Sequence, residues 1–426
     1  MSSGTEILVD QENVPLLQKQ TKDQESLKDL KGHVKPLLSA FFISIVAGLN
    51  DGSLGTIIPR MKADYDISNE TISILFLCWA CGLFISAGLN GYVVHSIGQL
   101  RALYLGSTSI LVAYIIISTA PPFIVVACTM PFVGAGMALL NAAMNVFVAN
   151  VPLATLMLNI LHAAFGFGAF ISPKVAAYLL ENEYPWSGMY VFLTGIAIVN
   201  IISITLGFYH VDFEEGKNDD DDDIKKMNHG ELTKLAILNK VTLVGAVYIL
   251  IYVGVEVTLG GWGFTWLTEG RHGEAGPMLD IMSSYWGGLA LGRLALGYLS
   301  GRFGEKLMIT LFTIMIISGL LVMIVSTDIF IDSSVLVSIG FLLGPMFPTT
   351  ISLASKALPR NYHSTSIGFM AALGAGGAAL FPFLTGQIAG KFGILVLPVV
   401  CVIMSVVMQI LWAFIPSDKP FFAACK

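Results

Sequence analysis

Twelve apolar segments, each close to the length of a membrane-spanning helix, leave this chain few ways to fold. A bilayer helix needs about 20 apolar residues. The chain is 55% hydrophobic and only 12% charged, whereas soluble domains carry about 25% charged residues. We therefore predict an all-α integral membrane protein. The predicted spans are roughly 36–59, 71–94, 102–120, 122–149, 156–180, 188–209, 240–266, 279–301, 307–326, 333–356, 363–389 and 393–415.

One long break divides these segments six and six. It contains the charged run "EEGKNDDDDDIKK", Glu214 to Lys226, which is typical of a solvated linker. Its aspartates lack a turn-forming scaffold, so we expect no calcium site there. The predicted organisation is a flexible tail, a six-helix half, an acidic linker, a second six-helix half and a short tail, at 1–35, 36–209, 210–235, 236–416 and 417–426.

The distribution of Lys and Arg predicts that both chain ends are cytoplasmic. With the ends inside, the inner segments hold 17 basic residues, and the outer loops hold only Arg60, Lys62, Arg271 and Lys391. Such a bias follows the positive-inside rule. The other two basic residues, Lys174 and Arg293, fall within helices, and we expect both near cytoplasmic helix ends as snorkelling or gating residues.

Several classes of function find no support in the residues. Four of the five cysteines lie in apolar helices, which argues against a disulfide framework or a metal site. No basic patch suggests nucleic acid, and no nucleophile–base pair or phosphate-binding loop suggests an enzyme. We expect no cofactor and a monomeric chain.

The two halves repeat each other. At a constant offset of 206 residues, "GLN" at 48–50 matches "GVE" at 254–256, so Asn50 corresponds to Glu256, and Gly55 corresponds to Gly261. Later the offset drifts to 209, where Gly168 corresponds to Gly377. Glycines allow helix backbones to approach closely, so shared glycines predict shared packing. Parallel six-helix repeats with a solute site between them define the major facilitator arrangement.

A loop motif agrees with that arrangement. The segment "GRLALGYLSGRFGEK", Gly292 to Lys306, resembles the conserved glycine-and-arginine loop between the second and third helices of a major facilitator half. The first-half copy, "GYVVHSIGQLR", keeps Gly98 and Arg101 and lacks the usual acid. The resemblance implies a gating loop formed by Gly292, Arg293, Gly297, Arg302, Gly304 and Lys306.

Three further stretches resemble the fucose-permease-like branch, particularly its fungal bypass-of-stop-codon-type members. They are "GLNDGSLGTIIP", "LNILHAAFGFGAFISP" and "YVGVEVTLGGW", in the first, fifth and seventh segments. The branch implies sugar transport coupled to a cation, usually a proton, and Asp51 matches an acid that the fucose permease needs. That permease also needs a fourth-helix glutamate, but here this helix carries Asn141 and Asn145, so fucose itself is in doubt.

Intramembrane acids are functional candidates because each costs about 2.5–3.5 kcal/mol or more near the bilayer centre. Asp51 and Glu256 both fall near the midplane, and either or both could carry a coupling proton. The alternative for Glu256 is a structural hydrogen bond to a neighbouring helix. Asn50, at the equivalent position, could share a solute hydroxyl with Glu256.

Other polar residues are weaker candidates for the solute site. Asn141 and Asn145 share a helix face and suit a sugar or an interhelix contact equally. Asn159 and His162 lie on the fifth helix, where the histidine could pass a proton or simply pack. Trp262 could stack on a sugar or serve as a packing residue.

The N-terminal tail contains "ENVPLL", with Glu12, Leu16 and Leu17 in the acidic dileucine pattern. On a cytoplasmic tail this resembles a sorting signal read by adaptors, which would direct the protein to the endosomal or vacuolar membrane. The plasma membrane is the alternative.

The sequence thus predicts a secondary transporter that moves a small polar solute such as a sugar, with a proton or sodium ion, by alternating access. An uncoupled facilitator or exporter and a non-transporting receptor or scaffold are the alternatives.

Overall fold

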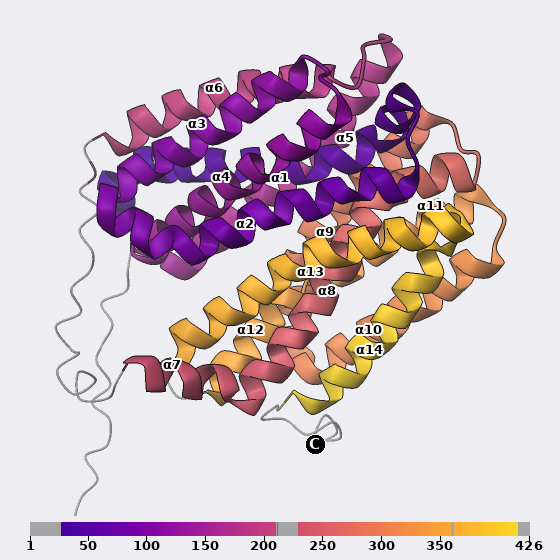
Figure 1. The fold of residues 1–426 in the computed structure, drawn as a ribbon. Coiled ribbons are helices and arrows are strands. Elements are labelled where there is room, and N and C mark those ends of the chain that lie inside the picture. The colour runs from indigo at the N-terminus through magenta and orange to yellow at the C-terminus, as the bar shows by residue number, and fades with distance from the viewer. Residues whose placement is uncertain (1–26, 210, 212–228, 359–361, 416–426) are drawn as a thin grey trace, which may run out of the picture.

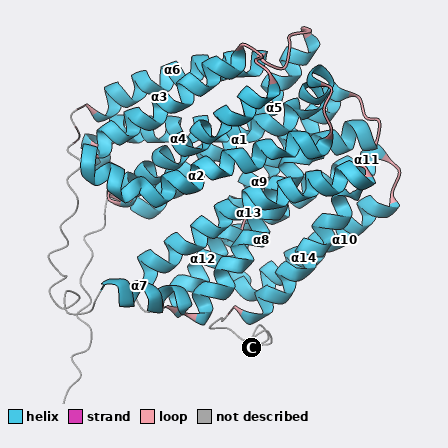
Figure 2. Cartoon of the chain, in the orientation of Figure 1, coloured by secondary structure: helices cyan, strands magenta, loops and turns pink. Residues whose placement is uncertain are grey.

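The computed structural model describes residues 27–209, 211, 229–358 and 362–415. Within these ranges the ordered elements are helices, and no strand occurs (Figure 2). The sorting motif, the acidic run and the C-terminal tail from 417 lie outside the described residues.

The first half is a bundle of six long helices, preceded by a short 3-10 helix, η1 (Leu27–Gly32). Their bounds are α1 (Val34–Tyr65), α2 (Asn69–Ile97), α3 (Gln99–Ser118), α4 (Phe123–Ala149), α5 (Ala154–Glu181) and α6 (Gly188–Phe208). Each falls on one predicted span, and α1 and α2 run beyond the apolar stretches into polar turns. At the start of α2, for example, the Ser68 side chain accepts a hydrogen bond from the Thr71 amide.

The second half is built in the same way, with two additions. A short helix, α7 (His229–Leu238), occupies the last residues of the predicted linker, and a π-turn, η3 (Trp266–Gly270), extends α8. The remaining elements are α8 (Lys240–Thr265), α9 (Ala275–Phe303), α10 (Glu305–Val325), α11 (Ile329–Leu343), α12 (Met346–Ala357), α13 (His363–Phe392), η5 (Ile394–Val396) and α14 (Leu397–Phe414).

One predicted span is broken in two. The segment predicted at 333–356 becomes α11 and α12, which are separated at Gly344 and Pro345. Proline has no backbone N–H to continue the ladder of α11 and is well suited to start a new helix. The chain therefore still crosses as one segment, but with an interruption about halfway along.

The described helices confirm an all-α membrane architecture of two six-helix halves. Eleven spans within the described residues are long and apolar enough to cross a bilayer, with α11 and α12 forming one of them. The predicted span at 279–301, which is α9, is not among them, because Asp280, Arg293 and Arg302 dilute its apolar character. It packs against α5 and α11 inside the bundle.

The internal repeat is visible in the packing. A β-carbon at Gly168 on α5 would collide with the carbonyl oxygen of Ile45 on α1, and one at Gly377 on α13 would collide with that of Leu250 on α8. The shared glycines thus bring α5 onto α1 and α13 onto α8 at equivalent places. This confirms the close approach that the repeat predicts.

The two halves meet mainly at one end of the bundle, which we call the distal end, where α1, α5 and α13 finish at Tyr65, Glu181 and Phe392. Toward the opposite end, where α7 and the end of α14 lie, the helices of the two halves spread apart (Figure 1). This opposite end, where α1 begins and α14 ends, is called the termini end.

Candidate solute site between the two halves

The first half contributes a polar cluster on α1 and α3. The Asn50 side-chain amide donates to the Asp51 carboxylate at 3.0 Å, and the Tyr114 hydroxyl donates to the Asn50 side-chain oxygen at 2.8 Å. Tyr114 is fully buried, whereas Asp51 is exposed. No ion pair joins Asp51 to a basic residue in the described part of the chain.

The second half contributes a contrasting cluster around Glu256. This glutamate is only 6% exposed. Its carboxylate accepts a short hydrogen bond from the Tyr252 hydroxyl and lies 3.3 Å from the Arg293 guanidinium on α9. The Tyr285 hydroxyl donates to the Glu256 backbone carbonyl at 2.8 Å. Glu256 is therefore paired with a cation and surrounded by tyrosines.

Both acids lie just below the point where the halves touch. A β-carbon at Gly55 on α1 would overlap the backbone of Gly260 and Gly261 on α8. Asp51 precedes Gly55 by four residues and Glu256 precedes Gly261 by five, or about 6–8 Å at 1.5 Å per residue. The two acids are close enough to act on each other electrostatically. The equivalent glycines predicted from the repeat thus form a seam that closes the site on its distal side.

Ion pairs reinforce the closed distal end. Lys62 on α1 lies 2.7 Å from Glu269 in η3, and Lys174 on α5 lies 2.5 Å from Asp280 on α9. Each pair joins one half to the other. Lys174 is seven residues from the distal end of α5, opposite the end where α1 begins and α14 ends. It therefore cannot lie on the same side as the chain ends, for which the cytoplasmic side is predicted.

The predicted polar residues on α4 share a face, as their spacing requires. Asn141 and Asn145 follow Gly134 by seven and eleven residues, and Gly134 packs tightly on Trp79 of α2. Both asparagines are exposed, and the Asn145 amide donates to the Asn141 backbone carbonyl at 2.8 Å. They therefore face the α2 side of the first half with hydrogen-bonding groups still available.

On α5, His162 is exposed and lies near enough to Arg293 of the other half to feel its charge. The side chain of Asn159 falls outside the described part of the chain. A packing role for the histidine would have required burial, so its exposure keeps it among the residues that a solute or proton could reach.

Trp262 is a correction to the sequence interpretation. Its side chain is 0% exposed, and its indole N–H donates to the Pro382 carbonyl at 2.9 Å. It also packs against Phe76 of the other half, with ring centroids 6.1 Å apart. No face of this ring is available for a sugar in this conformation, so Trp262 serves the closure of the halves instead.

The predicted gating loop is mostly helix. Gly292 and Arg293 lie inside α9, where Gly292 packs on the Phe341 backbone and Arg293 holds Glu256. Gly304, with φ of 106°, is the actual junction of α9 and α10. Lys306 is buried and donates to the carbonyls of Trp412 and Ile415, so it caps the end of α14. Gly297 faces open space, and Arg302 is exposed over the Phe303 ring.

Sequence reasoning missed the three tyrosines of the site. Tyr252 could have been found, because it precedes Glu256 by four residues and so shares its helix face. Tyr114 and Tyr285 approach from other helices, and no local spacing links them to the acids.

Two six-helix halves joined by a seam, with polar and acidic side chains beneath it, define a two-domain membrane transporter. A sequence profile described as the Major Facilitator Superfamily matches residues 40–382. The chain therefore belongs to this superfamily.

Named relatives place it further. It is 26% identical over 413 residues to Bypass of stop codon protein 6 of Saccharomyces cerevisiae, covering 89% of this chain and 82% of the relative. It is 23% identical to a glucose/galactose transporter of Brucella abortus, covering 85% and 89%. The crystal structure of the nucleoside transporter NupG superposes with a TM-score of 0.72 at 13% identity, covering 89% and 99%. The resemblance to the bypass-of-stop-codon-type proteins is thus confirmed, and the structural likeness shows the fold alone.

Proposed function

We propose that this protein is a proton-coupled transporter of a small, hydroxyl-rich solute, with Asp51 as the residue that carries the proton. The observation that supports this most directly is the difference between the two acids. Asp51 is exposed and has only a neutral amide as partner, whereas Glu256 is buried and already paired with Arg293.

An acid can couple transport to protons only if it gains and loses its proton during the cycle. Glu256 already has a cationic partner, because its carboxylate lies 3.3 Å from the Arg293 guanidinium. Asp51 has no such cation among the described residues, and the residue is exposed. Protonation of Asp51 would also relieve its repulsion from Glu256, which links its charge to the contact between the halves.

The site's composition favours a neutral polar solute such as a sugar. Asn50, Asn141 and Asn145 offer amide donors and acceptors, and the two acids add further acceptors. Hydroxyl-rich solutes need such neutral pairs because each buried hydroxyl must keep a hydrogen bond. The glucose/galactose transporter among the relatives supports the same class of solute.

We propose that the halves alternate access by rocking about this site. The conformation described is closed at the distal end by the glycine seam and two ion pairs. For the site to open toward the distal end, these contacts must separate and the termini end must close. A proton moving down a potential of 100 mV supplies about 2.3 kcal/mol, enough for roughly fifty-fold accumulation.

The experiment is uptake into proteoliposomes with imposed gradients. We expect D-galactose or D-glucose to drive proton movement, seen as alkalinisation of the compartment that the sugar leaves, and accumulation to require an inward proton gradient. A sodium gradient at constant pH serves as the alternative ion. Normal counterflow with no substrate-induced proton movement would favour an uncoupled facilitator or exporter instead. Absence of any flux, with ligand binding retained, would favour a receptor.

The membrane that houses the protein stays a prediction. With both ends on the cytoplasmic side, Glu12, Leu16 and Leu17 would present an adaptor-binding signal for the endosomal or vacuolar membrane. Replacing Leu16 and Leu17 by alanine should then move a fluorescent fusion to the plasma membrane.

A further inference from the structure

A second cavity lies on the other side of the glycine seam from the two acids. We call it the distal pocket; its volume is about 170 Å³. It is lined by both halves: Thr56, Ile57, Pro59, Arg60, Ala176, Leu179, Leu180, Pro185, Trp186 and Met189 from the first, and Phe264, Thr268, Ala275 and Leu279 from the second. Along α1 the order is Asp51, then Gly55 at the seam, then the pocket. An occupant of this cavity would therefore be separated from the central site.

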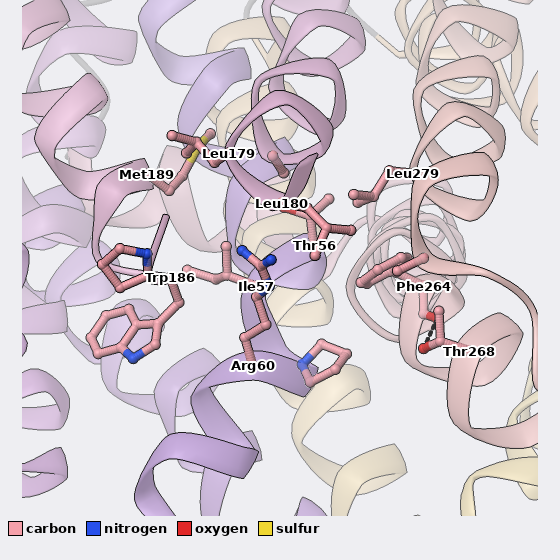
Figure 3. Close-up of a pocket in the computed structure, with 14 residues that line it drawn as sticks. Thr56, Ile57, Arg60, Leu179, Leu180, Trp186, Met189, Phe264, Thr268 and Leu279 are labelled. Carbon is pink, nitrogen blue, oxygen red and sulfur yellow. Dashed lines mark hydrogen bonds between the residues drawn. The ribbon is translucent and has the colours of Figure 1, made fainter. Parts of the chain in front are cut away.

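The only charged side chain that lines the distal pocket is Arg60. One guanidinium nitrogen donates to the Tyr184 backbone carbonyl at 3.1 Å, and no carboxylate pairs with Arg60 in the described part of the chain. The guanidinium points in among the lining side chains rather than away from them (Figure 3). Because a guanidinium has five N–H donors, at least one fork remains for a two-point contact with an anion.

Apart from Thr56 and Thr268, the rest of the wall is apolar. The Trp186 indole donates to the Asp64 carboxylate at 2.9 Å and packs against Tyr65 with ring centroids 5.5 Å apart. Its ring is thus fixed as one side of the pocket, and Phe264 and Leu279 from the second half are buried. Thr268, the polar lining residue from the second half, donates its hydroxyl hydrogen bond to the Phe264 carbonyl at 2.8 Å.

A single guanidinium that has no carboxylate partner among the described residues, facing a mostly apolar wall, is complementary to an anion with an apolar body. The volume sets the size, since a cavity of about 150 Å³ accepts benzene. A long acyl chain would not fit, and a neutral sugar would leave the arginine fork and the apolar wall poorly used. The chemistry that fits is a small monocarboxylate, aromatic or short and branched.

We infer that the distal pocket is a binding site for a small monocarboxylate of about the size of benzoate, and that its occupant holds the two halves together at the distal end. The second part follows from the lining, because a ligand that contacts both halves binds the closed distal end better than the separated one. The consequence for transport, inhibition that excess solute does not relieve, rests on the proposed alternating access. Binding itself does not.

The test is thermal unfolding of the purified full chain with benzoate, and with benzyl alcohol as the neutral analogue of the same size. At about 100 times its Kd, benzoate should raise Tm by about 3 °C, and benzyl alcohol should not. Arg60→Gln should abolish the rise. Lys391→Gln, which removes an exposed cation from the same end of the bundle, should keep it.

A second variant guards against misfolding of Arg60→Gln. Ala176→Leu fills the cavity and leaves the arginine in place, so it too should abolish the benzoate effect. Equal shifts with benzyl alcohol, a shift that survives in both variants, or no shift with benzoate would each overturn the site.

The clamping of the halves has its own readout. Spin labels at Thr119 and Thr327, exposed positions on opposite halves at the distal end, would be placed in a cysteine-free background. Benzoate should narrow the distribution of distances between the two labels to its shortest component. In Arg60→Gln the distribution should not change. Binding with an unchanged distribution would remove the clamping role. Because neither measurement uses transport, a failure here is distinct from a failure of the proton-coupling proposal.

Discussion

Asn50 and Glu256 occupy equivalent places in the two halves, yet their surroundings differ in every respect. Beside Asn50 the charged group is the carboxylate of the next residue, Asp51. This residue is exposed and has no cationic partner among the described residues. Around Glu256 the charge is buried, held by Arg293, and enclosed by Tyr252 and Tyr285. The equivalent helices thus carry an exposed acid without a cationic partner among the described residues in one half and a buried ion pair in the other.

The difference shows how equivalent positions in the two repeats can take on different properties. A buried ion pair gains strength from its low-dielectric surroundings, but breaking it by removing one partner is costly. An exposed acid contributes little to stability and is free to change its charge. Variants that exchange these properties should therefore separate stability from coupling.

The largest expected effect on stability is that of Glu256→Gln. It leaves the Arg293 guanidinium without its carboxylate in a mostly buried place, which should lower the free energy of unfolding by about 3–5 kcal/mol. Denaturant titration in detergent measures this. Asp51→Asn is the matched control, because it changes an exposed acid with no ion pair and should stay within about 0.5 kcal/mol of the parent.

A double variant sharpens this prediction. Glu256→Gln with Arg293→Met removes both charges and should recover most of the lost stability, since an apolar replacement of a buried pair is often neutral. If the double variant is as unstable as the single one, the ion pair is not what holds the second half together.

Asp51→Asn should have the largest effect on coupling. Without a titratable acid the protein should still exchange labelled solute across the membrane, but the roughly fifty-fold accumulation per 100 mV should fall to equilibration. Exchange should also lose its dependence on pH. Retained accumulation in this variant would move the coupling role to another residue, with His162 the next exposed titratable group.

The tyrosines extend the comparison to a smaller effect. Tyr252→Phe removes a hydrogen bond to a charged, buried carboxylate and should cost about 1.5–3 kcal/mol. Tyr114→Phe removes one to the partly exposed Asn50 amide and should cost about 1 kcal/mol. Both can be read from the same denaturant titrations. Equal costs would show that the second-half cluster is no more tightly coupled than the first.

The residues around Glu256 show which features could be predicted from the sequence and which could not. The twelve helical spans and the equivalence of Gly55 and Gly261 could be predicted, because hydropathy and glycine positions are properties of one segment at a time. The contact between these two glycines across the halves could not. The pairing of Arg293 with Glu256 could not. The motif that contains Arg293 indicated a loop, and a one-dimensional pattern gives no sign that a helix 37 residues later turns the guanidinium toward the acid. The burial of Trp262 was missed for the same reason, because it depends on Phe76 of the opposite half.

The smallest expected effect concerns the distal ion pairs. Lys174 and Asp280 are both exposed, so Lys174→Gln should shift the balance between distal-closed and distal-open forms by no more than about 1 kcal/mol, or about five-fold. Spin labels at the same two distal positions would report this as a modest gain of the longer distance. The effect should fade in high salt, because exposed charges are screened, whereas the loss of unfolding free energy caused by Glu256→Gln should persist. If the change in the distance distribution of Lys174→Gln did not depend on salt, the Lys174–Asp280 pair would behave as a buried ion pair, like Glu256 and Arg293.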